Sequence, residues 1–172
     1  SGSAARSVEG PIVLWGKHAA IPYSSDLFGV RWTKAADVFK TYQDTILLVD
    51  KGQKEVSSTV GHNLMHNHPF AENRFAQAKA HYQALLTILE KGDMDGFSDL
   101  VEREALSLHA MMLTSSPSFI LMHPNTIQII KEVRRYRKTT GLHLTFTLDA
   151  GANVHLLYPA HEAEKIDQFI VS

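Results

Sequence analysis

Residues 144–158 read Leu-Thr-Phe-Thr-Leu-Asp-Ala-Gly-Ala-Asn-Val-His-Leu-Leu-Tyr, and this stretch decides the fold. Its first part, 144–148, alternates along the chain and contains β-branched and aromatic side chains, which predicts a strand. The small and polar residues 149–153 predict a turn, and the apolar residues 154–158 predict a second strand. The stretch is therefore expected to form an antiparallel β-hairpin.

Three segments upstream of this hairpin predict amphipathic helices, because their apolar residues recur every three or four positions. They cover about 70–89, 97–112 and 126–139, with Thr126 or the residue before it as the cap of the last helix. A further helix is expected over 160–171.

One more buried strand is predicted at 45–50, Thr-Ile-Leu-Leu-Val-Asp, and a short strand is expected near 27–30 within a region of loops. The order of elements is strand, helices, hairpin and helix. That order predicts the α+β class, with helices packed on one face of an antiparallel sheet.

Composition excludes several classes of function. The chain has no cysteine, so disulfides, thiol catalysis and cysteine zinc sites are absent and a reducing, cytoplasmic compartment is expected. The net charge of −1 predicts no partner among nucleic acids or anionic membranes, and the basic run 131–138 is interpreted as a solvated helix face. No apolar stretch approaches the roughly 20 residues that span a bilayer.

Asp149 is the first candidate for chemistry. A carboxylate in a turn of small residues at the end of a strand can reach a substrate and take a proton from it or orient its hydroxyl. The alternative is a structural Asx-turn, in which the carboxylate accepts local N–H groups.

Two further runs could bind phosphate. The first, Ser1-Gly2-Ser3-Ala4-Ala5-Arg6-Ser7, combines close backbone approach, hydroxyls and one guanidinium, although such a run also occurs as a cloning remnant. The second, Val56-Ser57-Ser58-Thr59-Val60-Gly61, offers three hydroxyls before a glycine, although such runs are also ordinary turns.

Histidines form the remaining candidate cluster. His62 and His66 are four residues apart and could share a metal with His68, which would make the chain a metal-binding or interaction module. A third or fourth ligand is not identifiable, and polar loop histidines are the alternative. No metal site is therefore assigned.

Taken in order, these pieces resemble the mevalonate diphosphate decarboxylase family of the GHMP kinase superfamily. The family's Ser-Gly-Ser-Ala-Cys-Arg-Ser run is similar to 1–7, with Ala5 in place of Cys, and its Ser-Ser/Thr-x-x-Gly segment to 57–61. Its Ser/Asn-x-x-His-Ala helix end is similar to 104–110, a Ser/Thr-x-x-Ile-Ile helix start matches 126–130, and its Thr-x-Asp-Ala-Gly-Pro-Asn turn resembles 147–153.

The resemblance implies ATP-dependent decarboxylation of mevalonate 5-diphosphate to isopentenyl diphosphate, with Mg²⁺, in isoprenoid biosynthesis. It implies that Asp149 and Arg6 are catalytic. It also implies that the substrate is bound by Ser1, Gly2, Ser3, Ala4, Ala5, Arg6, Ser58 and Thr59.

The resemblance also implies a ferredoxin-like C-terminal domain of GHMP kinases over 45–172, shortened at its end, after a remnant of the N-terminal domain over 1–44. The ATP loop is then expected upstream, the fragment is expected to be inactive alone, and a homodimer is possible. Ala152 replaces the family's Pro and Glu9 adds a negative charge near the anion site. A GHMP kinase that phosphorylates a related hydroxylated anion without decarboxylation is the alternative.

Overall fold

The computed structural model describes most of the chain, namely residues 9–19, 21–52 and 63–171. Its centre is a three-stranded antiparallel sheet, whose spatial order is β3 (Tyr42–Leu47), β5 (Val154–Pro159) and β4 (Thr145–Leu148). In the β4–β5 hairpin, Phe146 pairs with Leu156 and Leu148 pairs with Val154. The hairpin predicted from the sequence is therefore confirmed.

The longer helices of the described residues are α4 (Ala71–Lys91), α5 (Met94–Leu113), α6 (Pro124–Thr140) and α7 (Ala163–Val171). Gly92 ends α4 in a left-handed conformation, with φ of 72°. The next residue, Asp93, is the N-cap of α5. Its carboxylate accepts a hydrogen bond from the Gly96 N–H at 2.9 Å and so satisfies a free donor of the first turn.

The start of α6 differs from the prediction. Its N-cap is His123, and Pro124 occupies the first turn, where a missing N–H costs nothing. Thr126 lies inside the helix, and its hydroxyl accepts from the His123 backbone N–H at 3.2 Å. The last predicted helix begins as a 3₁₀ turn, η1 (Ala160–Glu162), before α7.

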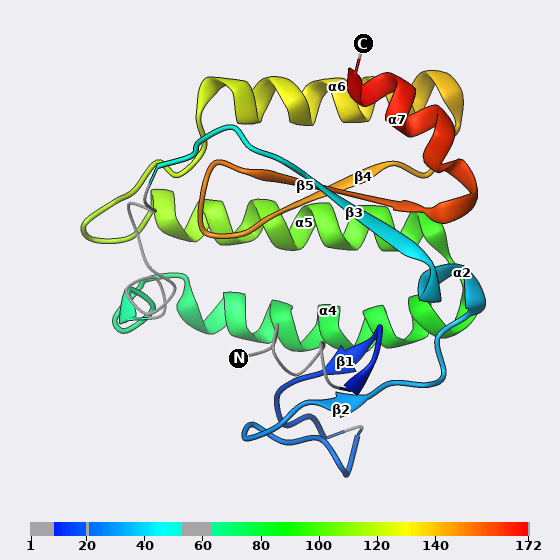
Figure 1. Ribbon diagram of the computed structural model, residues 1–172. Helices are drawn as coiled ribbons and strands as arrows, with labels where there is room; N and C mark the ends of the chain where they lie inside the picture. The colour runs from blue at the N-terminus through cyan, green and yellow to red at the C-terminus, as the bar shows by residue number, and fades with distance from the viewer. Residues whose placement is uncertain (1–8, 20, 53–62, 172) are drawn as a thin grey trace.

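Helices lie on both sides of the hairpin, as Figure 1 shows, with α6 and α7 above the sheet and α5 below it. The alternating strand residues that face α6 and α7 form the main core. This core consists of Ile130, Val133, Leu144, Phe146, Leu148, Val154, Leu156, Tyr158 and Ile166, with Ala105 of α5. The α+β class is confirmed, with α5 as an additional layer along β4.

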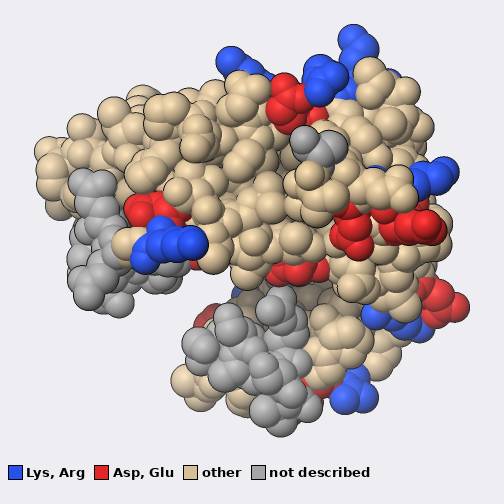
Figure 2. Space-filling model, turned by 45° about the horizontal axis from the view of Figure 1, so that its top comes forward, with Lys and Arg blue, Asp and Glu red and all other residues tan. Residues whose placement is uncertain are grey.

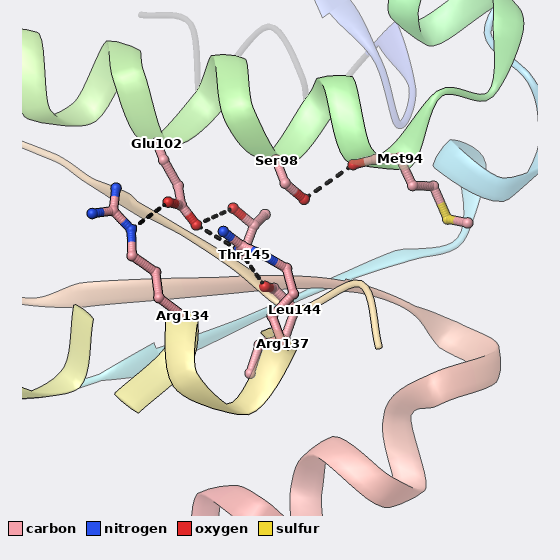
Figure 3. Close-up of polar contacts among 7 residues, drawn as sticks. All are labelled: Met94, Ser98, Glu102, Arg134, Arg137, Leu144 and Thr145. Atoms are coloured by element: carbon pink, nitrogen blue, oxygen red, sulfur yellow. Dashed lines mark hydrogen bonds and ion pairs between the residues drawn. The ribbon is translucent and has the colours of Figure 1, made fainter. Parts of the chain in front are cut away.

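A buried carboxylate ties these layers together (Figure 3). Glu102 points from α5 toward α6 and accepts hydrogen bonds from Arg134 Nε at 2.9 Å, Arg137 at 2.6 Å and the Thr145 hydroxyl at 3.1 Å. Its side chain is only 5% exposed, so the two guanidinium groups supply the charge that burial requires. Arg137 also donates to the Leu144 carbonyl at 2.7 Å.

The N-terminal part packs on α4 as a second cluster. A two-stranded sheet of β1 (Val13–Leu14) and β2 (Val30–Arg31) is followed by the short helix α2 (Asp37–Lys40). The strand expected near 27–30 thus begins only at Val30. The cluster consists of Leu14, Ile21, Trp32, Ala35, Phe39, Leu86 and Leu89.

The strand predicted at 45–50 needs correction. β3 begins earlier, at Tyr42, ends at Leu47, and among the described residues it is an edge strand that pairs only with β5. Ile46 is 50% exposed and Leu48 is 61% exposed, so the apolar run is not buried on both faces. Ile46 and Leu48 lie two residues apart, so the exposed side chains share one face of the chain at this strand.

Charge is sparse and mixed in sign over the face seen in Figure 2, in agreement with the net charge of −1. In the parts of the chain that the structure describes, no helix is long and apolar enough to cross a membrane.

Candidate active site

Asp149 lies in the turn between β4 and β5, at the end of the sheet where the connection from α5 to α6 passes (Figure 1). Its side chain is exposed, and Ala150, Gly151 and Ala152 follow it. The Gly151 N–H donates to the Asp149 carbonyl at 2.8 Å, which closes the turn locally. Asp149 therefore lies exposed in a turn of small residues.

Three distant segments hold this turn. From α5, Nε2 of His109 lies 3.1 Å from the Asp149 carbonyl oxygen. From α6, the Thr126 hydroxyl donates to the Ala152 carbonyl at 2.6 Å. The amide oxygen of Asn153 accepts from the backbone N–H groups of Val49 at 2.9 Å and Asp50 at 3.0 Å, beyond the end of β3.

His109 is almost fully buried, with 1% of its surface exposed. Burial lowers the pKa of its imidazole, and the Asp149 carbonyl and charge oppose this shift in part. A carbonyl oxygen can only accept, so Nε2 of His109 carries the hydrogen. The histidine therefore acts as a neutral donor to the backbone of the turn.

A small pocket of about 80 Å³ opens beside the carboxylate. Its polar side chains include Asp50, His123, Asp149 and Asn153, and Ile120 and Leu121 form an apolar side. His123 Nε2 lies 3.9 Å from an Asp50 carboxylate oxygen, and both side chains are about half exposed. The pocket thus combines two carboxylates with one imidazole.

This arrangement suits chemistry on a hydroxyl group. An exposed carboxylate can accept a proton from an alcohol or orient it, provided that the two groups are held within hydrogen-bonding reach. The three backbone anchors keep the turn in place before a substrate arrives, which is the structural requirement for such catalysis.

Among the other predicted site residues, Ser1, Gly2, Ser3, Ala4, Ala5 and Arg6, together with Ser58 and Thr59, lie outside the described residues. Asp149 is the predicted site residue that the structure places.

The histidine cluster is described in part. His62 lies outside the described residues and His66 is exposed. Both ring nitrogens of His68 bond within the protein: Nδ1 accepts from the Phe70 N–H at 3.1 Å, and Nε2 lies 3.1 Å from the Met111 carbonyl oxygen. In the described ranges, no group of three His, Asp or Glu residues could hold a metal ion.

Sequence reasoning placed His109 and Thr126 only in helix motifs and missed their contacts with the turn. One signal could have indicated His109. It follows Ala105 by four residues and precedes Met112 by three, so it lies on the apolar side of its helix. A histidine on such a face needs a polar partner in the core.

Comparison with known proteins places most of the chain in one family. Residues 45–172 match the family model described as the mevalonate 5-diphosphate decarboxylase C-terminal domain. The chain is 25% identical over 173 residues to the diphosphomevalonate decarboxylase of Candida albicans, covering 96% of this chain and 46% of the relative. It is 26% identical over 97 residues to the phosphomevalonate decarboxylase of Haloferax volcanii, covering 56% of this chain and 30% of the relative.

A solved structure, that of mevalonate pyrophosphate decarboxylase from Streptococcus pyogenes, superposes with a TM-score of 0.83 at 25% identity. The match covers 98% of this chain and 50% of that structure's chain, and the chain spans less than half the length of the two curated relatives. Because the family model covers most of the sequence, the chain belongs to the mevalonate 5-diphosphate decarboxylase family and contains its C-terminal domain.

Proposed function

We propose that the full-length polypeptide carrying this chain converts mevalonate 5-diphosphate and ATP into isopentenyl diphosphate, ADP, phosphate and CO₂. The observation that supports this most directly is the Asp149 turn, with an exposed carboxylate beside a pocket and a backbone that His109 and Thr126 hold. The side chain of Asn153, in the same turn, accepts from the Val49 and Asp50 N–H groups. The names of the curated relatives support the choice of a decarboxylase over a simple kinase.

In this proposal Asp149 is the candidate catalytic residue. It orients the tertiary C3 hydroxyl of the substrate, or accepts its proton, while that oxygen attacks the terminal phosphate of ATP. The resulting phosphate is the leaving group when the neighbouring carboxylate departs as CO₂. The small residues after Asp149 leave room for a crowded tertiary alcohol.

Substrate anions would be bound by the two other segments of the proposal. Arg6 would hold the carboxylate and phosphate side of the substrate, because its guanidinium can bind such groups bidentately. The diphosphate would contact Ser1, Gly2, Ser3, Ala4 and Ala5, with Ser58 and Thr59. These roles are carried by the resemblance of the runs to the family's motifs.

ATP and Mg²⁺ are the proposed cofactors, and their binding groups are proposed to lie outside the residues described here. When bound, they supply the phosphoryl group and neutralise its charge. We further propose a division at 44/45 between a remnant of the N-terminal GHMP domain and the C-terminal domain. We also propose that the full-length protein is cytoplasmic, that it forms a homodimer, and that it has no nucleic-acid or membrane partner.

The test uses the full-length polypeptide, mevalonate 5-diphosphate labelled in its carboxylate, and ATP. Stoichiometric release of labelled CO₂ and ADP is expected, and Asp149→Asn is expected to lower kcat by at least about 100-fold, the lower end of the usual range for acid–base groups. ADP without CO₂ would instead establish the kinase alternative. An Asp149→Asn variant as active as the wild type would show that this carboxylate has no part in the mechanism. A parallel assay with mevalonate 5-phosphate tests whether the site selects the diphosphate or the monophosphate.

A further inference from the structure

The buried histidine of α5 requires an explanation beyond packing. His109 has neighbours on its helix face such as Ala105 and Met112, which belong to apolar clusters. A polar ring in such surroundings loses its hydration, and that loss is offset only where it forms hydrogen bonds. The bond that the structure gives His109 goes to the main chain of Asp149, the residue that would perform the chemistry.

The hydrogen bond from His109 to the Asp149 carbonyl restricts the orientation of the Asp149 side chain. The carbonyl carbon and Cβ of Asp149 are both bonded to the same Cα, so a fixed carbonyl restricts rotation of the backbone that carries the side chain. At the other end of the turn, Thr126 holds Ala152 in the same way, through a side chain that is fully buried. The His109 bond ties the Asp149 carbonyl to a separate helix, whereas the Gly151 bond to the same carbonyl is local to the turn.

We propose that His109 is a positioning residue for Asp149, which it orients by donating from Nε2 to the Asp149 carbonyl. This inference rests on the proposed function of Asp149. Displacement of a reacting group by about 1 Å can lower a rate about 100-fold. The role therefore predicts an effect on kcat, because substrate binding depends on other segments of the site.

The first experiment compares His109→Leu and His109→Gln in the full-length polypeptide. His109→Leu removes the donor and is expected to lower kcat about 10- to 100-fold, with KM changed less than about threefold. His109→Gln places an amide N–H near the former Nε2 and is expected to retain kcat within about fivefold. Wild-type kcat in the Leu variant, or equal losses in both variants, would overturn the proposal.

His68 provides the matched control. It is also a buried histidine that bonds a carbonyl of α5, that of Met111, and the hydrogen bonds of its ring go to Met111, Phe70 and Thr114. His68→Leu is expected to lower thermal stability about as much as His109→Leu while leaving kcat within about twofold of wild type. A loss of kcat in His68→Leu equal to that in His109→Leu would assign the effect to general destabilisation and overturn the positioning role.

A second measurement is independent of catalytic activity. The ring nitrogens of the ten histidines are observed by NMR after labelling with ¹⁵N-histidine, and His109 is assigned by its absence from the His109→Gln spectrum. At neutral pH the Nε2–H tautomer is expected, and the Nδ1–H tautomer would overturn the proposal whatever the activity. Absence of CO₂ release from the wild-type protein overturns the proposed function instead, so the two failures are distinguishable.

Discussion

Replacing Glu102 by Leu is expected to lower the free energy of unfolding by about 3–4.5 kcal/mol. Hydrogen bonds to charged groups contribute about 1.5–3 kcal/mol each, and the bond to Arg137 is of this kind because that arginine is only 23% exposed. Arg134 is 48% exposed, so its share is discounted to about 0.5 kcal/mol. The Thr145 hydroxyl adds about 1 kcal/mol. The total agrees with the range of about 3–5 kcal/mol for breaking a buried ion pair.

The assay is equilibrium unfolding in urea, followed by circular dichroism at 222 nm because the affected elements are helices. Tryptophan fluorescence is the wrong probe here, since Trp15 and Trp32 both lie in the N-terminal part. Glu102→Gln keeps one acceptor oxygen and loses the charge, so an intermediate loss of about 2 kcal/mol is expected.

The matched control is Glu132→Gln. Glu132 pairs with Arg135 one turn along α6, where the two side chains are 35% and 68% exposed, so a change below about 0.5 kcal/mol is expected. A loss below about 1 kcal/mol for Glu102→Leu, or one no larger than that of the control, would refute the reasoning. An unchanged m-value is required for the comparison.

Two further predictions concern the Asp149 turn. Burial lowers the pKa of His109 from its ordinary value of 6.5, so the unfolded chain binds a proton that the folded chain resists. The contribution of the neutral His109 to stability is therefore present above about pH 6.5 and is lost as the pH falls through the pKa of the folded state. Because His109→Gln removes this titrating group, Tm is expected to fall less steeply between about pH 7 and pH 5 in the variant than in the wild type. Identical slopes of Tm against pH would contradict this. Asn153→Ala leaves the backbone N–H groups of Val49 and Asp50 without their side-chain acceptor and is expected to cost about 1–2 kcal/mol in urea unfolding, whereas unchanged stability would show that these bonds contribute nothing.

The elements with a strong local pattern were predictable. The alternation of 144–148, the apolar run 154–158 and the small residues between them indicate the hairpin that the structure shows. Gly92 and Gly141, both with φ of 72°, end α4 and α6 in the left-handed conformation that glycine adopts readily. In these segments, local propensity and the tertiary structure favour the same conformation.

Predictions that depended on distant partners were less accurate. The run at 45–50 has the apolar composition of a central strand, yet β3 lies at the sheet edge, a position decided by its pairing with β5 more than a hundred residues away. His123 caps α6 although histidine is not a preferred capping residue, because its N–H reaches Thr126 and Pro124 follows it.

For the site, the turn and its carboxylate were predictable from composition and resemblance, but its supports were not. His109 and Thr126 lie on two different helices, and only the packing of α5 and α6 around the hairpin brings them to the same turn. A single sequence contains no signal for such contacts apart from a polar residue on an apolar face.

The same supports have a consequence for how the site forms and is lost. The hydrogen bonds of Thr126, His109 and Asn153 at this turn join residues that are 26, 40 and 104 positions apart in the sequence. The conformation of this five-residue turn therefore depends on the packing of α5, α6 and the end of β3 around it. Closing each of these long loops costs chain entropy, so we expect these hydrogen bonds to form late in folding. We also expect them to break early when the packing between the elements loosens. We therefore expect activity to be lost at a lower denaturant concentration or temperature than helical structure, because the Asp149 turn changes its conformation before the helices unfold.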